Sequence, residues 1–160
     1  MFWDILSDII VALAILAFAA IVFTGFYQLI KRKSLKKVDR EISLMAVPAI
    51  LLLIVYVIFE NLIILNTRPN GSGEPSFPST HTMITATIFF CIAVALPRYI
   101  KSKTACIIID AIMLILLTLL CFGRVLADMH WVSDVLAGLS FSLFFAAIYC
   151  LLIQKGALDA

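Results

Sequence analysis

Two short polar stretches, residues 66–81 and 123–134, carry the residues in this chain whose types and spacing could do chemistry. Each stretch holds one of the two histidines and one arginine: Arg68 and His81 in the first, Arg124 and His130 in the second. An arginine fork fits phosphate or carboxylate oxygens, and a histidine can act as a nucleophile or carry protons. The two stretches therefore predict one anion-handling site built from both.

The neighbours of the two histidines sharpen this prediction. Ser79 and Thr80 come directly before a helical run, so their hydroxyls and the free backbone N–H groups of the helix start can cradle an anion. His130 and Asp134 are spaced i and i+4, which places them on one helix face if the helix has begun by His130. The Asp134 carboxylate is expected to accept the Nδ1–H of His130 and to leave Nε2 as nucleophile or base. With His81 as a general acid, the set indicates phosphoryl transfer.

The elements that must position these residues are membrane spans. Hydrophobic residues make up 64% of the 160 residues and charged residues only 14%, against about 25% charged in an average globular chain. Several apolar runs reach the length of about 18 or more residues that marks a span. The sequence thus predicts an all-α, polytopic membrane helix bundle, one domain over residues 1–160. Its five expected spans cover about 5–30, 42–65, 81–97, 104–122 and 131–153.

The positive charges lie on one side of the expected bundle. Ten of the twelve Lys and Arg residues fall in the loops 31–41 and 98–103 or near the C-terminus, and only Arg68 and Arg124 fall on the other side. By the positive-inside rule, the N-terminus is expected outside and the C-terminus in the cytoplasm. Both polar stretches would then face the outside of a cell membrane. The basic segment 31–40 indicates a loop facing lipid headgroups, with no sign of nucleic-acid binding.

Three motifs in the chain resemble a known family. They are Arg68-Pro69, then Pro78-Ser79-Thr80-His81, then Gly123-Arg124 followed at fixed spacing by His130 and Asp134. Together they resemble the signature of the type 2 phosphatidic acid phosphatase superfamily, Lys-x6-Arg-Pro, Pro-Ser-Gly-His and Ser-Arg-x5-His-x3-Asp. The resemblance covers about residues 58–140.

The resemblance implies a role for each matching residue. His130 would be the nucleophile that forms a phosphohistidine, Asp134 would orient it, and His81 would protonate the leaving group. Phosphoryl oxygens would be held by Arg68, Ser79, Thr80 and Arg124. Members of the family need no metal or other cofactor, and the membrane branch acts on lipid phosphates and diphosphates at the outer face. An isoprenoid (undecaprenyl) diphosphate and a phosphatidic-acid-type lipid are the leading substrates, and the oligomeric state is left open.

The sequence departs from the family pattern at three positions. Asn61 stands where the family has its lysine, Thr80 replaces a glycine, and Gly123 replaces a serine. Thr80 keeps its backbone N–H and Gly123 loses only a hydroxyl, whereas Asn61 removes a phosphate-binding cation. Asn61 therefore motivates an alternative function, a catalytically weak or silent member that binds or moves a phospholipid.

Two further alternatives concern individual side chains. His81, His130 and Asp134 are a donor set that can hold zinc, although the two nearby arginines would repel a metal cation. Glu60 can serve as an interfacial acid or as the ion-pair partner of Arg68, and we favour the partner role.

Overall fold

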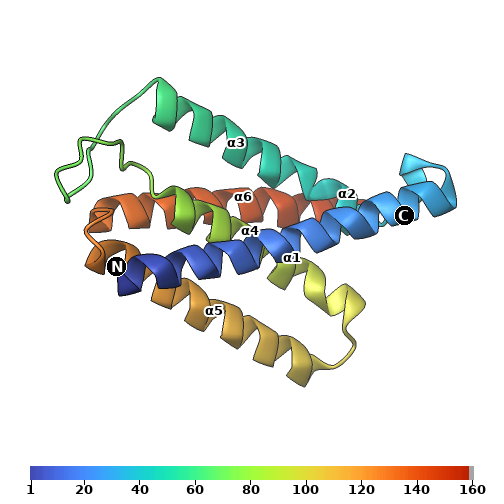
Figure 1. Ribbon diagram of the computed structural model, residues 1–160. Coiled ribbons are helices and arrows are strands. Elements are labelled where there is room, and N and C mark those ends of the chain that lie inside the picture. The colour runs from blue at the N-terminus through green and yellow to red at the C-terminus, as the bar shows by residue number, and fades with distance from the viewer. Residues whose placement is uncertain (159–160) are drawn as a thin grey trace.

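The computed structural model describes residues 1–158 and consists of helices joined by short connections and one long loop (Figure 1). The helices are α1 (Phe2–Arg32), the 3-10 turn η1 (Leu35–Lys37), α2 (Arg40–Leu44), α3 (Ala46–Asn61), α4 (Thr80–Tyr99), α5 (Lys103–Leu126) and α6 (Val132–Leu158). Within these described residues, five segments are long and apolar enough to cross a membrane, with α2 and α3 together forming the second. The predicted all-α membrane bundle is confirmed, and the chain is a multi-pass membrane protein.

The second span is broken into α2 and α3 at Met45 for a local reason. Pro48 lies in the first turn of α3, where its missing N–H costs nothing. Its ring would clash with the carbonyl four residues earlier in a continuous helix, and that residue is Leu44, the last of α2. The span therefore continues with an offset instead of as one regular helix.

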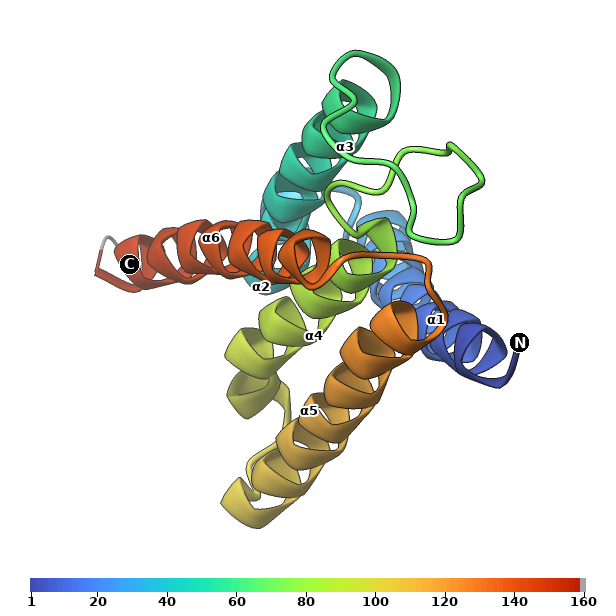
Figure 2. The same cartoon turned by 90° about the vertical axis from the view of Figure 1, so that its left-hand side faces the viewer.

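Helix α4 is the centre of the bundle and packs against α1, α3, α5 and α6 (Figure 2). Half of the residues in its most apolar 18-residue stretch are buried inside the protein, against 11% to 33% for the corresponding stretches of the other four spans. Its neighbours cover it with apolar side chains such as Ala14 of α1 and Leu117 of α5, which meet Ala86 and Phe89. The first turn of α4, which carries the motif residues Thr80 and His81, is thereby fixed relative to the surrounding helices.

The α3–α4 loop, the α5–α6 connection and the N-terminus all lie at one end of the bundle (Figure 1). The two polar stretches therefore meet, as the sequence predicts. Three helix ends differ from the expected spans by four residues or more, and one of them is that of α6, which continues to Leu158 instead of ending near residue 153. Helix α3 stops at Asn61 instead of near residue 65, and α5 continues to Leu126, so Arg124 is a helical residue.

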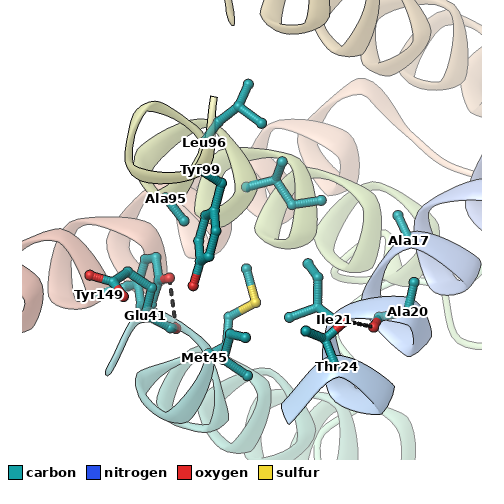
Figure 3. Close-up of a pocket in the computed structure, with 12 residues that line it drawn as sticks. Ala17, Ala20, Ile21, Thr24, Glu41, Met45, Ala95, Leu96, Tyr99 and Tyr149 are labelled. Atoms are coloured by element: carbon teal, nitrogen blue, oxygen red, sulfur yellow. Dashed lines mark hydrogen bonds between the residues drawn. The ribbon is translucent and has the colours of Figure 1, made fainter. Parts of the chain in front are cut away.

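An apolar cavity of about 430 Å³ lies among α1, α2, α4 and α6, near the C-terminal end of α4 (Figure 3). The polar groups at its edge already have hydrogen-bond partners within the protein. The hydroxyl of Tyr149 donates to the backbone carbonyl of Glu41 at 2.9 Å, and the Glu41 carboxylate pairs with Arg98. This cavity is suited to hydrocarbon and lies far along α4 from the motif residues.

Candidate active site

The long loop is fastened to the start of α6 by hydrogen bonds that bring the two polar stretches together. The side-chain amide of Asn66 donates to Asp134 Oδ1 at 3.1 Å, and the backbone N–H of Ser79 donates to the Asp134 carbonyl at 3.0 Å. Within the loop, the N–H of Ser76 donates to the carbonyl of Asn66 at 3.0 Å. Asp134 thus holds both ends of the loop segment that precedes α4.

Gly138, one turn further along α6, permits this close approach. A Cβ added there would lie 2.9 Å from the carbonyl oxygen of Ser79 and 3.3 Å from Thr82 Cβ. Any larger residue would push α6 away from the first turn of α4. The contact between the second and third motifs therefore depends on a glycine outside both.

His130 lies in the α5–α6 connection and is 3% exposed. Its Nδ1 is 2.8 Å from the backbone carbonyl of Ser76, and its Nε2 is 3.4 Å from Arg124 Nη2. A carbonyl can only accept a hydrogen bond and a guanidinium can only donate, so the proton belongs on Nδ1 and the lone pair on Nε2. Burial, together with the positive charge of Arg124, lowers the pKa of His130 to about 4. The imidazole is therefore neutral near pH 7.

Asp134 does not make the bond to His130 that its spacing predicts. Its Oδ2 lies 4.0 Å from His130 Nδ1, beyond hydrogen-bonding distance, and the carbonyl of Ser76 occupies that position instead. Asp134 Oδ2 accepts the backbone N–H of Trp131 at 3.0 Å, as the third residue of a helix does in a capping box. The predicted hydrogen bond between Asp134 and His130 is wrong. Helix α6 begins after His130, and the Asp134 carboxylate instead accepts the backbone N–H at the start of that helix.

The two arginines of the site have different carboxylate partners. Arg124 is 3% exposed and its Nη1 lies 3.0 Å from Asp4 Oδ1, while Arg68 Nη1 pairs with Glu74 Oε2 at 2.7 Å. The structure thus corrects the expected partner of Arg68, since Glu74 of the same loop replaces Glu60. Within residues 1–158, the buried Nε atoms of both arginines have no hydrogen-bond partner. A buried, unpaired donor is costly, and an anion bound between the two arginines would satisfy both.

The first turn of α4 differs in one detail from the predicted anion cradle. The backbone N–H of Ser79 is used by the Asp134 carbonyl, and its hydroxyl accepts a hydrogen bond from Thr82 Oγ1 at 3.0 Å. Ser79 is 0% exposed. The cradle therefore does not include the Ser79 N–H, and the candidate donors are the next groups, Thr80 and His81. A helix leaves the N–H groups of its first turn without intrahelical partners.

His81 and the start of α1 form a contact that the motifs do not predict. His81 Nε2 lies 3.0 Å from Asp8 Oδ1, and the same oxygen is 3.8 Å from Arg124 Nη1. Ser7 accepts a further hydrogen bond from Arg124 at 3.5 Å. One signal could have found these residues. Asp4 and Asp8 are two acids one turn apart in an otherwise apolar span, and ionisable residues there are functional candidates.

Helix α1 also explains one departure from the family pattern. A Cβ at Gly123 would lie 3.1 Å from the backbone carbonyl of Trp3 and 3.8 Å from Ser7 Cβ. The start of α1 thus packs into the space that a serine side chain at position 123 would occupy. Asn61, the other important departure, is exposed and donates its amide to the Val57 carbonyl at 3.2 Å, so it supplies no cation.

The assembled site has a buried floor and a more open rim. Arg124, His130 and Asp134 are nearly inaccessible, whereas the side chains of His81 and Arg68 are 30% and 27% exposed. The buried pair Arg124 and His130 therefore adjoins the partly exposed His81, which Asp8 links to Arg124. The zinc alternative fits less well, because Arg124 places positive charge at 3.4 Å from the one free nitrogen of His130. No cluster of three or more metal-ligating side chains occurs in the part of the chain that the structure describes.

Comparisons with known proteins agree with these motifs. Among curated proteins, none matches the chain. Among solved structures, the chain is similar to the first transmembrane PAP2 type phosphatidylglycerolphosphate phosphatase from Bacillus subtilis. The TM-score is 0.65 and the identity 20%, with 96% of this chain and 77% of that chain covered. The model of the PAP2 superfamily matches residues 57–157, more than half of the chain and all three motifs. The chain therefore belongs to the PAP2 superfamily.

Proposed function

We propose that this protein is a membrane phosphatase that hydrolyses a lipid phosphate or diphosphate through a phosphohistidine on His130. The observation that carries the proposal is the state of His130 between Ser76 and Arg124. The carbonyl of Ser76 holds the proton on Nδ1, and the lone pair of Nε2 faces the guanidinium that would also hold a phosphoryl oxygen. A neutral, oriented imidazole beside buried positive charge suits attack on phosphorus.

The reaction is written in two displacements. In the first, His130 Nε2 forms a bond to phosphorus while the bond from phosphorus to the leaving oxygen breaks, and His81 donates a proton to that oxygen. Arg68, Arg124 and the first-turn N–H groups of α4 hold the phosphoryl oxygens. In the second, water attacks phosphorus, the N–P bond breaks, and the water proton returns to His81. Inorganic phosphate leaves from a monophosphate, and no metal or other cofactor takes part.

The place of the site in the bundle supports a lipid substrate. The site residues lie at the end of five apolar spans, so a phosphate headgroup can reach them while its hydrocarbon stays among the helices. The ten-to-two distribution of Lys and Arg supports an outer-face location. An undecaprenyl-type diphosphate and a phosphatidic-acid-type lipid remain the leading candidates, and the phosphatidylglycerolphosphate named for the similar Bacillus subtilis structure is a third.

The test uses detergent-purified protein and a panel of lipid phosphates, with inorganic phosphate release as the readout. His130→Ala should abolish both turnover and a trapped covalent phosphoenzyme. His81→Ala should lose about 10²- to 10⁴-fold on an alkyl phosphate lipid, the usual contribution of a general acid. It should lose much less on p-nitrophenyl phosphate, whose leaving group is stable as an anion. A phosphoenzyme that still forms in His130→Ala would end the assignment of the nucleophile.

A second candidate function rests on Asn61. Because its side chain is turned back onto α3 and supplies no positive charge, the site has one phosphate-binding cation fewer than the family pattern provides. A weak or silent member that binds or moves a phospholipid would show lipid phosphate binding without turnover across the panel. If so, Asn61→Lys should raise turnover.

A further inference from the structure

The start of α1 places a carboxylate directly on His81, outside the three motifs. Asp8 Oδ1 lies 3.0 Å from His81 Nε2, within normal hydrogen-bonding distance. The Asp8 side chain is 56% exposed, so no burial penalty opposes its negative charge. Asp4, one turn earlier, pairs instead with Arg124 at 3.0 Å. Both acids of α1 therefore lie within ion-pair distance of Arg124, since Asp8 Oδ1 is 3.8 Å from its Nη1, and Asp8 in addition contacts His81.

Such a contact has two chemical effects on an imidazole. It fixes the orientation of the ring through Nε2, and it stabilises the protonated form, because an opposite charge within hydrogen-bonding distance favours the charged state. The charged groups that act on His81 are Asp8 and Asp4 from α1 and Arg124 from α5. The partial burial of the His81 ring and the positive charge of Arg124 both disfavour the protonated form, and Asp8 is the group in direct contact that favours it. A general acid must carry a proton when the leaving group departs.

We propose that Asp8 is a positioning residue for the leaving-group proton transfer, acting through His81; the inference rests on the proposed role of His81. Asp8 holds the Nε2–H of the imidazolium, and the Nδ1–H passes to the leaving oxygen as its bond to phosphorus breaks. His81 is then neutral and still bonded to Asp8 through Nε2–H. The water that hydrolyses the phosphohistidine returns a proton to Nδ1. The general acid, His81, thus belongs to a family motif, whereas Asp8, the residue that orients it, belongs to α1.

If the Asp8–His81 pair had only a structural role, its removal would affect both substrates alike. An exposed pair contributes little to stability, so Asp8→Asn should fold like the parent protein. A positioning role instead predicts a loss that depends on the leaving group. Asp8→Asn should lose about ten- to a hundredfold on an alkyl phosphate lipid, a part of the range expected for the whole acid, and change little on p-nitrophenyl phosphate. The alkaline limb of its pH profile on the lipid should move to lower pH.

The experiment compares Asp8→Asn, Asp4→Asn, His81→Ala and the double variant Asp8→Asn/His81→Ala on both substrates. Asp4→Asn is the matched control, because it makes the same charge change on the same helix, at an acid that pairs with Arg124 and makes no hydrogen bond to His81. It should alter KM without changing the ratio of activities on the two substrates. The double variant should be no slower than His81→Ala alone, and Asp8→Glu should recover part of the lipid activity.

The possible outcomes separate the inference from the proposed function. If His81→Ala shows no dependence on the leaving group, the proposed acid itself is wrong. If His81→Ala shows that dependence and Asp8→Asn does not, or if Asp8→Asn loses equally on both substrates, the positioning role is overturned. Additional loss in the double variant would likewise overturn it, because Asp8 would then act independently of His81.

Discussion

Replacing Asp134 by asparagine tests how the nucleophile is held. The Asp134 carboxylate accepts from the Trp131 backbone N–H at 3.0 Å on Oδ2, and from the Asn66 amide at 3.1 Å and the Ser133 hydroxyl at 3.4 Å on Oδ1. An asparagine has the same shape but only one acceptor oxygen. With the Asn66 amide kept in its present orientation, either the Trp131 N–H or the Asn66 amide then faces another donor in a place closed to solvent, since Asp134 is 0% exposed.

The size of the effect follows from that mismatch. A buried donor left unsatisfied costs about 1–3 kcal/mol. Each 1.4 kcal/mol corresponds to about a factor of ten. The value of kcat/KM should therefore fall by about 5- to 150-fold if the whole of this free energy is lost from the positioning of His130. The imidazole keeps its tautomer, because the Ser76 carbonyl holds Nδ1–H. Where a carboxylate holds the histidine directly, as in the serine protease triad, the same substitution costs about 10⁴-fold through the wrong tautomer.

The assay is kcat/KM on p-nitrophenyl phosphate, with thermal unfolding of the same detergent preparations. The matched rescue is Asp134→Asn combined with Asn66→Asp. In the double variant the new amide at position 134 can donate to the new carboxylate at position 66 and still accept from the Trp131 N–H, which restores one donor for each acceptor. We expect the double variant to recover most of the activity and stability lost in Asp134→Asn. A loss near 10⁴-fold with no rescue would refute this reasoning and return Asp134 to direct contact with the imidazole.

Three further predictions concern charge, metal and topology. In a His81→Gln variant His130 is the only histidine, and its ring nitrogens, observed by ¹⁵N NMR, should show the neutral Nδ1–H form near pH 7 and titrate near pH 4, because the pKa of His130 is lowered to about 4. Titration near the ordinary value of about 6.5 would contradict the buried geometry. Turnover should survive EDTA, since arginines supply the positive charge, and a loss restored by zinc would favour the metal alternative. Cysteine at Ser72, but not at Ser34, should react with an impermeant thiol reagent on intact cells, and the reverse labelling would invert the proposed topology.

The sequence determined the membrane bundle and the identity of the motif residues. A span must satisfy its own backbone hydrogen bonds in lipid, so long apolar runs leave helices as the available structure, and five are found. The fixed spacing from Arg124 through His130 to Asp134 likewise belongs to the chain itself. Two membrane spans separate the two polar stretches, and an even number of spans returns the chain to the same side. The prediction that both stretches form one site needed only this, and the structure places them at the same end of the bundle (Figure 1).

Tertiary structure decided which group meets which. The partner of His130 Nδ1 is a backbone carbonyl of Ser76, 54 residues away, and no side-chain pattern marks a carbonyl for that role. Arg68 pairs with Glu74 instead of Glu60 because the loop folds back on itself, with Thr67 bridging Pro75, while α3 ends at Asn61. Asp8 reaches His81 only because α1 packs closely on α5 at Gly123 and lies beside α4. Spacing along a chain predicts contacts within one helix, whereas contacts between helices depend on side-chain packing that only the folded bundle defines.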